Sequence, residues 1–248
     1  MNYLRSALLA LWLAIITPPY AIIAMASFPF SAHRRYRIIS GWVILAMWGI
    51  RVFTGIRYRV LGRENIPDRP SVVMSKHQSA WETIALQRVF PPIVFVLKRE
   101  LLRLPFFGWG LAQLPVIAID RAAGREALQQ VAEQGKDRLA RGFWVVIFPE
   151  GTRVPVGGTR RYKAGGAWLA SASGAQVVPV AHNAGEFWPR NSFLKRPGEI
   201  TVSVGPAIDT RGLTHDQINA KVEAWIEAEM RRLFPHHYHD GPGRTAAA

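Results

Sequence analysis

Cysteine is absent from the chain. Its absence excludes disulfide bonds, thiolate metal sites and a cysteine nucleophile. Acidic residues are also scarce, with 17 Asp and Glu against 31 Lys and Arg, which leaves a formal net charge of +14 at pH 7. An excess of positive charge this large indicates an anionic partner, such as a nucleic acid, a phospholipid surface or a phosphorylated substrate.

The distribution of charge selects among these partners. No acidic residue precedes Glu64, whereas eight arginines do, and they flank apolar stretches: Arg5, Arg34, Arg35, Arg37, Arg51, Arg57, Arg59 and Arg63. Nucleic-acid-binding proteins seldom combine basic residues with long apolar segments, whereas membrane-surface proteins commonly do. We therefore expect an anionic phospholipid bilayer as the partner, and no nucleic acid. Hydrophobic residues make up 49% of the chain, which excludes disorder as its bulk state.

Two apolar runs occupy the N-terminal part of the chain. Residues 6–32 carry no charge and can cross a hydrocarbon core of about 30 Å as a helix, although Pro18 and Pro19 should break or kink that helix. A second uncharged run, residues 38–50, is too short to span comfortably. Two arrangements stay open: a helical hairpin that dips into one leaflet, or a spanning first segment followed by an interfacial second one.

A cleavable signal peptide is a third interpretation, because Ala24, Met25 and Ala26 resemble a cleavage site. The apolar run continues beyond these small residues, however, and three arginines follow it within residues 34–37. Arginines in that position favour the cytoplasmic side of a membrane. We therefore expect residues 1–56 to be an uncleaved membrane-anchoring helical segment, at the cytoplasmic face of the inner (plasma) membrane.

From residue 57 onward, short β-branched runs alternate with helical stretches, which is typical of an α/β domain with a largely parallel central sheet flanked by helices. The expected strands are residues 58–61, 71–74, 93–97, 116–119, 144–148, 176–180 and 200–204. The expected helices are residues 81–89, 125–141, 167–172 and 216–233. This domain should cover residues 57–240. Residues 241–248 contain no core-forming side chains, so we expect a frayed tail.

His77 and Glu82 directly follow one of the expected strands and are separated by four residues. Within one helix the two side chains would point about 140° apart. They can meet only if His77 lies in the loop and Glu82 in the first helical turn. Ser79 and Glu82 form a capping-box pattern that places the helix start there. Two interpretations stay open: Glu82 caps the helix, or it orients the His77 imidazole for proton transfer.

A second motif, Phe-Pro-Glu-Gly-Thr-Arg at residues 148–153, ends the most hydrophobic expected strand. Ligands of α/β sheets bind at the carboxyl ends of strands. A glycine for close backbone approach and an arginine for bidentate contact suit a phosphate group. Further basic residues follow strand ends or nearby loops, namely Lys98, Arg121 and the cluster at residues 160–163. Together they predict an anion-binding crevice.

These segments, in this order, resemble the motifs of the 1-acylglycerol-3-phosphate (lysophosphatidate) O-acyltransferase family. The resemblance covers roughly residues 57–205 and includes residues 118–121 and 177–181. It implies that His77 is the general base and that Glu82 stands where the family has an orienting aspartate, one methylene shorter. It further implies two groups of substrate contacts: Lys98, Arg121 and Arg153 with a phosphate, and Glu150, Gly151 and Thr152 with the acceptor.

The resemblance also implies a reaction. A fatty acyl group would pass from acyl-CoA or an acyl-carrier protein to the free hydroxyl of a lysophospholipid, first of all 1-acylglycerol-3-phosphate. Because a thioester is already activated, we expect no metal, no cofactor and no covalent enzyme intermediate. A general base contributes roughly 10²–10⁴-fold to such a rate, and substrate positioning and oxyanion stabilisation must supply the rest.

Several alternatives were weighed against this interpretation. The acceptor could be another lysolipid, such as a lyso-ornithine lipid, and the unusual Glu82 is compatible with a non-catalytic lipid-binding protein of the same fold. Ser79 as a nucleophile lacks the G-x-S-x-G elbow, so a capping role is favoured. A metal site at residues 236–239 is disfavoured, because Asp240 is its only neighbouring carboxylate in the sequence.

Overall fold

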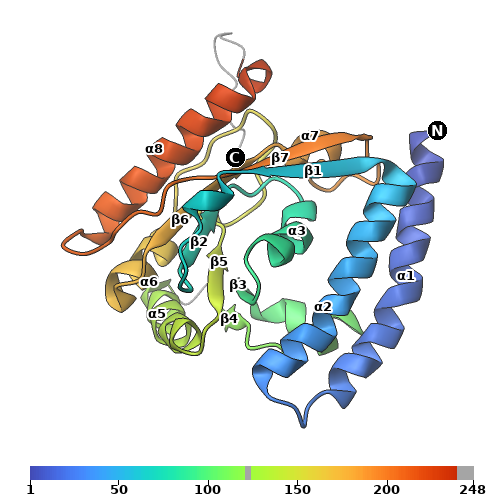
Figure 1. Ribbon diagram of the computed structural model, residues 1–248, viewed down its shortest axis with the longest axis horizontal. Helices are drawn as coiled ribbons and strands as arrows, with labels where there is room; N and C mark the ends of the chain where they lie inside the picture. Colours follow the sequence, from blue (N-terminus) through green and yellow to red (C-terminus); the bar gives the residue numbers. More distant parts are fainter. Residues whose placement is uncertain (121–123, 239–248) are drawn as a thin grey trace.

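The computed structural model describes residues 1–120 and 124–238 (Figure 1). At its centre, the described strands form a seven-stranded sheet in the order β1-β7-β6-β2-β5-β3-β4. Neighbouring strands are parallel except for the antiparallel pair β6 and β7. The strands are β1 (Ile56–Leu61), β2 (Val72–Ser75), β3 (Ile93–Lys98), β4 (Ile117–Ile119), β5 (Trp144–Ile147), β6 (Val177–His182) and β7 (Gly198–Val204). The predicted α/β fold with a largely parallel sheet is therefore confirmed, and each strand lies within a residue or two of its expected range.

The middle of the sheet explains the continuous apolar runs in the sequence. Val72 of β2 pairs with Val145 of β5 on one side and with Val177 of β6 on the other, and every residue of these three strands is buried. Strands that are paired at both edges and covered on both faces have no solvent-facing side to fill with polar residues. Because β2, β3 and β5 are parallel, the segments that follow them emerge at the same edge of the sheet.

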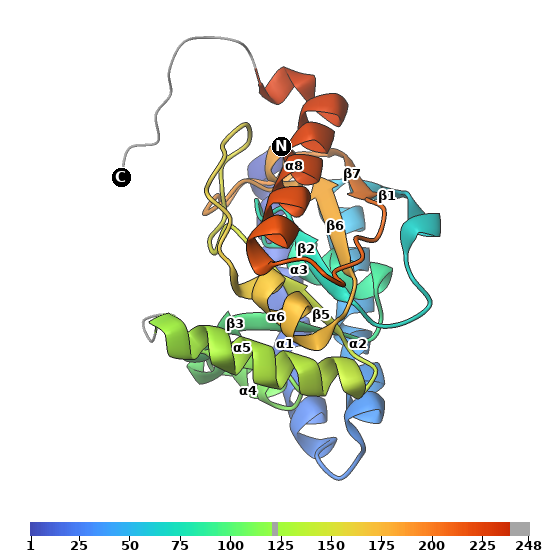
Figure 2. The ribbon, with the colours of Figure 1, turned by 90° about the vertical axis from the view of Figure 1, so that its left-hand side faces the viewer.

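Helices cover both faces of the sheet (Figures 1 and 2). One face carries α5 (Gly124–Ala140), α6 (Gly165–Ser173) and α8 (His215–Leu233), and the other carries α3 (Trp81–Val89) and the N-terminal helices. Alternate strand residues divide between two hydrophobic cores: Val72 packs toward the α8 side, and Val73 packs toward Trp81. All four expected helices are present. The short helices α4 (Phe107–Ala112) and α7 (Ala184–Phe187) were not predicted. Shorter turns are a π-helical one at Ile50–Thr54 (η1) and 3-10 turns at Arg63–Asn65 (η2), Arg99–Arg103 (η3) and Pro235–His237 (η5).

The N-terminal segment is a helical hairpin of α1 (Asn2–Ala26) and α2 (Ala32–Gly49), which lie side by side (Figure 1). Of the break or kink expected at Pro18 and Pro19, the break does not occur, because α1 runs through both prolines without interruption. Hydrogen bonds from outside the α-helical ladder support this region. The Thr17 hydroxyl donates to the carbonyl of Leu13 at 2.6 Å and accepts from Trp42 Nε1 of α2 at 3.1 Å. The bond from Trp42 joins α1 to α2 beside the two prolines.

The hairpin packs on the α/β domain and shares its core. Leu9 of α1 and Val43 of α2 belong to the same buried cluster as Trp81 of α3 and Val178 of β6. The two hairpin helices also approach each other closely, since a Cβ added at Gly49 would come within 2.2 Å of the Trp12 side chain. Small residues permit such contact between helices. Residues 1–56 are therefore continuous with the domain that follows.

The outer surface of the hairpin is strongly apolar. Its exposed large hydrophobic side chains are Met1, Tyr3, Leu4, Leu8, Leu11, Ile15, Ile22, Ile23, Met25, Ile44, Trp48 and Val52. Two stretches, Asn2–Ala26 and Ala32–Thr54, are long and apolar enough to cross a membrane. In the most apolar 18 residues of each stretch, only 22% and 28% are buried inside the protein. The short run at residues 38–50 thus belongs to a longer helix than its uncharged length suggests.

Candidate active site

The turn after β2 brings His77 and Glu82 together. His77 lies in that turn, Glu82 lies in the first turn of α3, and their Nδ1 and Oε1 atoms are 2.8 Å apart. The same carboxylate oxygen accepts the backbone N–H groups of Gln78 at 2.9 Å and Ser79 at 2.7 Å. Glu82 Oε1 therefore contacts both the start of the helix and the His77 ring, so the capping and orienting interpretations are compatible. Only half of the capping box forms, because the Ser79 hydroxyl accepts from Trp81 N at 3.1 Å.

The Glu82 carboxylate is fully buried and ionised. Burial raises its pKa, but the neighbouring His182 and His77 and the N–H of Ser79 outweigh burial, so the pKa of Glu82 lies below its usual range. An ionised carboxylate can only accept, so His77 Nδ1 carries the proton of the shared hydrogen bond. This tautomer leaves Nε2 as the nitrogen that can take up a proton. The ring is further fixed by stacking on Phe148, at 3.9 Å between centroids.

The Glu150 side chain points into the protein interior. It is fully buried, Oε2 accepts the backbone N–H of His77 at 2.7 Å, and Oε1 lies 2.8 Å from Lys76 Nζ. The lining of the large cavity beside His77 includes Gly151, Thr152 and Arg153, whereas the Glu150 carboxylate points into the protein. Gly151 has a φ of +70° and sits so close to Lys163 that a Cβ would come within 2.8 Å of its Cε. The positive φ favours glycine there, whereas the flexible Lys163 side chain can move aside.

Two of the three expected phosphate-binding residues, Lys98 and Arg153, lie at the same cavity. Lys98 ends β3, Arg153 follows the turn after β5, and both line the cavity. Arg153 is held through its backbone, because its carbonyl accepts from Arg190 Nη1 at 2.8 Å. Arg190 lines the cavity as well, which the sequence did not predict. Arg121 lies outside the described residues.

The cavity has a volume of about 590 Å³ and two chemically different parts. Its polar part contains His77, Lys98 and Arg153. Its apolar part is built by the hairpin and α4, through Leu13, Ala21, Ala24, Trp42, Val43, Phe106, Phe107 and Leu111. This volume is in the range of ligand pockets, and the arrangement suits a molecule with an anionic head and a hydrocarbon chain. Sequence analysis missed the apolar wall, because nothing in an apolar run tells whether it faces lipid or a cavity.

Lys76 and His182 support the His77 turn from behind. Lys76 Nζ lies 2.7 Å from Glu227 Oε1 of α8 as well as close to Glu150, and these carboxylates raise the pKa of Lys76 although burial alone would lower it. His182 Nε2 donates to the Lys76 carbonyl at 2.8 Å, and its Nδ1 accepts from Ala184 N at 3.2 Å. Burial lowers the pKa of His182, and the nearby Glu82 opposes this shift. Sequence analysis assigned no role to these residues.

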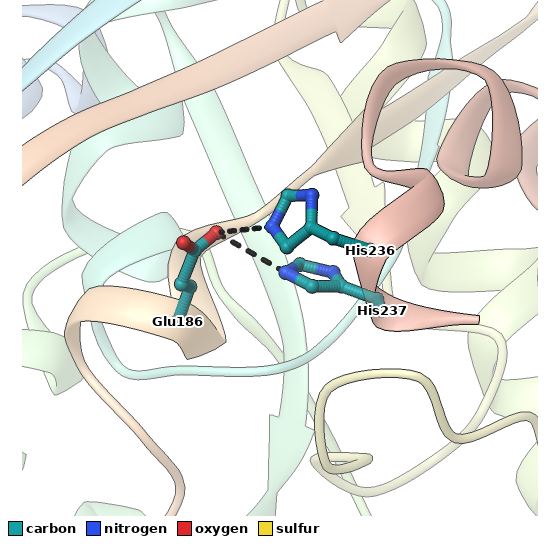
Figure 3. Close-up of side chains that lie close together, drawn as sticks. All are labelled: Glu186, His236 and His237. Carbon is teal, nitrogen blue, oxygen red and sulfur yellow. Dashed lines mark hydrogen bonds and ion pairs between the residues drawn. The ribbon is translucent and has the colours of Figure 1, made fainter. Parts of the chain in front are cut away.

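Glu186, His236 and His237 form a separate cluster between α7 and the turn η5 (Figure 3). His237 Nε2 lies 3.1 Å and His236 Nε2 lies 3.5 Å from the same oxygen, Glu186 Oε2. Sequence analysis considered this histidine segment as a metal site but paired it only with Asp240. His239 and Asp240 lie outside the described residues, as does the tail expected to be frayed. The carboxylate that the structure supplies comes from Glu186, which is distant in sequence.

Comparisons with known proteins identify the family. A model of the acyltransferase family matches residues 57–183. A 1-acyl-sn-glycerol-3-phosphate acyltransferase of Pseudomonas aeruginosa is 48% identical over 210 residues, which cover 84% of this chain and 81% of that protein. The human 1-acyl-sn-glycerol-3-phosphate acyltransferase beta is 32% identical, over 80% of this chain and 71% of that protein.

A solved structure supports the fold independently. The crystal structure of the 1-acyl-sn-glycerophosphate (LPA) acyltransferase PlsC from Thermotoga maritima superposes with a TM-score of 0.75 at 23% sequence identity. The match covers 94% of this chain and 98% of that one, so it includes the N-terminal hairpin. The chain therefore belongs to the acyltransferase family, within the group of 1-acylglycerol-3-phosphate O-acyltransferases.

Proposed function

We propose that this enzyme transfers a fatty acyl group from an acyl thioester to the free hydroxyl of 1-acylglycerol-3-phosphate and so forms phosphatidate, with His77 as general base. The observation that carries the proposal is the hydrogen bond between His77 Nδ1 and the buried Glu82 carboxylate, in the wall of a cavity with a basic part and an apolar part. The names of the curated relatives support the same acceptor.

The reaction follows from that geometry. His77 Nε2 takes the proton of the acceptor hydroxyl while the hydroxyl oxygen attacks the thioester carbonyl. The new C–O bond forms, the C–S bond breaks, and the imidazolium returns the proton to the leaving thiolate. Glu82 stabilises the positive charge of the imidazolium in between, as a buried carboxylate does beside a catalytic histidine.

Lys98 and Arg153 would bind the phosphate of the acceptor, with Arg121 as a third group by resemblance. The backbone of Gly151 and Thr152 lies in the same cavity wall as Arg153 and would border the glycerol part. A phosphate in this position compensates cationic side chains that would otherwise face one another across the cavity. These contacts favour a phosphate-bearing acceptor over a lyso-ornithine lipid, whose head group carries no phosphate.

The hairpin would bring the cavity to the membrane. Its apolar outer surface favours a lipid environment, and its inner surface forms the apolar cavity wall, so an acyl chain could pass from one to the other. The cytoplasmic face is supported by the arginines at residues 34–37. The donor would be acyl-CoA or acyl-carrier protein, both of which are anionic thioesters that the exposed Arg160 and Arg161 suit.

Thiol release and phosphatidate formation by the purified protein in mixed micelles would test the proposal. We expect turnover with 1-acylglycerol-3-phosphate, and slower turnover with a lyso-ornithine lipid or a neutral lysolipid. Parallel reactions with acyl-CoA and acyl-carrier protein identify the donor. Lysolipid binding without consumption of either thioester would instead favour the non-catalytic alternative.

A further inference from the structure

We propose that Glu150, Lys76 and Glu227 form a connected and largely buried set of ionisable groups that positions His77, and that Glu150 acts through His77 and not on the acceptor. This inference rests on the proposed function and deepens it. The Lys76 ammonium group connects the two carboxylates, because its Nζ lies 2.8 Å from Glu150 Oε1 and 2.7 Å from Glu227 Oε1.

The first argument is where Glu150 points. Its side chain is fully buried, and its Oε2 accepts the His77 backbone N–H at 2.7 Å. On the other side of the same residue, the His77 carbonyl accepts from Val154 N at 2.7 Å. His77 is thus fixed at its ring by Glu82 and at both backbone groups by the turn that contains Glu150. Displacement of either support would move Nε2 relative to the acceptor hydroxyl.

The second argument is the cost of burying these charges. An uncompensated buried charge is strongly destabilising, and one lysine can neutralise only one of two carboxylates. Burial raises the pKa of Glu150 to about 7, against the opposing effect of Lys76. The hydrogen bond from the backbone N–H of His77 to Glu150 gives this costly group a role in positioning the catalytic histidine.

The same ionisable groups connect the His77 turn to α8, a helix whose residues do not line the cavity. Glu227 lies on α8, and Tyr162 donates to the same Oε1 atom at 3.1 Å. Lys76 Nζ also lies 3.3 Å from the carbonyl oxygen of Gly158. These contacts join α8 and the loop at residues 158–162 to the catalytic turn. Glu227 does not line the cavity, and its direct contact with the His77 turn is the one with Lys76.

Two single substitutions separate positioning from acceptor binding. Glu150→Gln and Glu227→Gln each leave one carboxylate for Lys76, so both proteins should fold. Glu223→Gln, one helical turn before Glu227 on α8, serves as the matched control. The wild-type protein and His77→Ala are assayed first, because an inactive wild-type protein would refute the proposed function and not this inference.

We expect Glu150→Gln to lower kcat about tenfold or more while the KM for 1-acylglycerol-3-phosphate stays within about twofold, since an interaction that acts only on the transition state lowers kcat alone. Glu227→Gln should lower kcat in the same direction, and Glu223→Gln should not. In protein labelled with ¹⁵N-histidine, the His77 ring signals, assigned with His77→Ala, should shift in Glu150→Gln and Glu227→Gln. An increased KM with unchanged kcat in Glu150→Gln, or a wild-type kcat in Glu227→Gln, overturns the proposal.

A different observation carries a second inference. The geometry points to a binding site for a divalent transition-metal ion, of the Zn²⁺ class, between Glu186, His236 and His237 (Figure 3). The candidate ligand atoms all lie within 4.8 Å of one another. A tetrahedral site with bonds of about 2.0–2.1 Å separates its ligand atoms by about 3.3–3.4 Å, and the two contacts to Glu186 Oε2 are 3.1 and 3.5 Å long.

The donor set and its exposure fit such an ion. Two imidazoles and a carboxylate are common ligands of Zn²⁺. The His237 side chain is nearly buried and the His236 side chain is more than half exposed, so the site is open to a water ligand on one side. A bound ion would link the turn after α8 to α7, which leads directly into Trp188 of the cavity wall.

A competing explanation is a metal-free cluster, in which Glu186 Oε2 accepts from His237 and from Asn183 Nδ2 at 3.1 Å each. Calorimetric titration of the full-length, chelator-treated protein with ZnCl₂ distinguishes the two. We expect one high-affinity ion per chain, lost in Glu186→Gln and in His237→Ala but retained in His215→Ala, an exposed histidine at the start of α8. The absence of high-affinity binding, or its retention in Glu186→Gln, contradicts the site.

Discussion

Replacement of Glu82 by glutamine removes one buried charge and leaves the shape of the side chain unchanged. The glutamine oxygen can still accept from the N–H groups of Gln78 and Ser79, which Glu82 Oε1 accepts at 2.9 and 2.7 Å. The bond to His77 Nδ1 also survives as a neutral one. What disappears is the negative charge that would stabilise an imidazolium.

The expected magnitudes differ for stability and for rate. Exchange of charge-assisted for neutral hydrogen bonds costs about 1–2 kcal/mol, and the relief of carboxylate desolvation offsets part of it. For a chain of this size, 1 kcal/mol corresponds to about 2–4 °C in Tm. Loss of the charge that stabilises the His77 imidazolium should lower kcat by about 10²–10⁴-fold, or about 3–5 kcal/mol of activation free energy. The effect on rate therefore exceeds the effect on stability.

The stability difference should also depend on pH. The pKa of Glu82 is lowered in the folded protein by His182, His77 and the Ser79 N–H, which outweigh burial. A group with a depressed folded pKa stabilises fully above its unfolded pKa, about 4.3 for glutamate, and loses that contribution as pH falls through the folded value. The Tm difference between wild type and Glu82→Gln should therefore shrink in acid. Measured kcat and Tm decide the matter: a Glu82→Gln enzyme that keeps its rate and loses its stability would show that Glu82 is only a cap.

The remaining predictions concern the side chain at residue 82, the phosphate site and the hairpin. Glu82→Asp should keep substantial activity, as thiol release will show, because the family's usual aspartate still carries the charge. Arg153→Ala should raise KM more for 1-acylglycerol-3-phosphate than for a neutral lysolipid, and equal losses would indicate a structural role. Full-length protein should resist high-salt washing of membranes and require detergent, because the outer hairpin is apolar; release by salt alone would exclude an inserted hairpin. Deletion of residues 1–56 should weaken membrane association and lower Tm, because Leu9 and Val43 share the core of the domain.

The strands and long helices were predictable because their signals are local. Strands such as Val177–His182 are continuous apolar runs, and α8 begins with the capping box of Thr214 and Gln217. The break expected at Pro18 and Pro19 does not occur, because a rule about proline in an isolated helix takes no account of packing. In the folded protein α1 lies against α2, and Trp12 and Thr17 of α1 are hydrogen-bonded to it.

Contacts within the site could be predicted only between residues that are near in sequence. His77 and Glu82 are close enough for their contact to follow from the loop and the helix start. The partners of Lys76 are Glu150 and Glu227, which come from the turn after β5 and from α8, so their proximity depends on the packing of the whole sheet. For that reason the motif at residues 148–153 predicted a ligand loop but not that Glu150 turns inward. For the same reason, the sequence did not predict that Glu186 lies beside His236 and His237.

The central claim is that His77 is the general base, and its substitution tests that claim most directly. His77→Ala leaves Glu82 bonded to the N–H groups of Gln78 and Ser79, so the turn should keep its structure. The measurement is the initial rate of phosphatidate formation from 1-acylglycerol-3-phosphate and an acyl thioester, with Tm as the check of folding. We expect a folded His77→Ala protein whose rate is lower by about 10²-fold or more. A folded His77→Ala protein that forms phosphatidate at the wild-type rate would contradict the account.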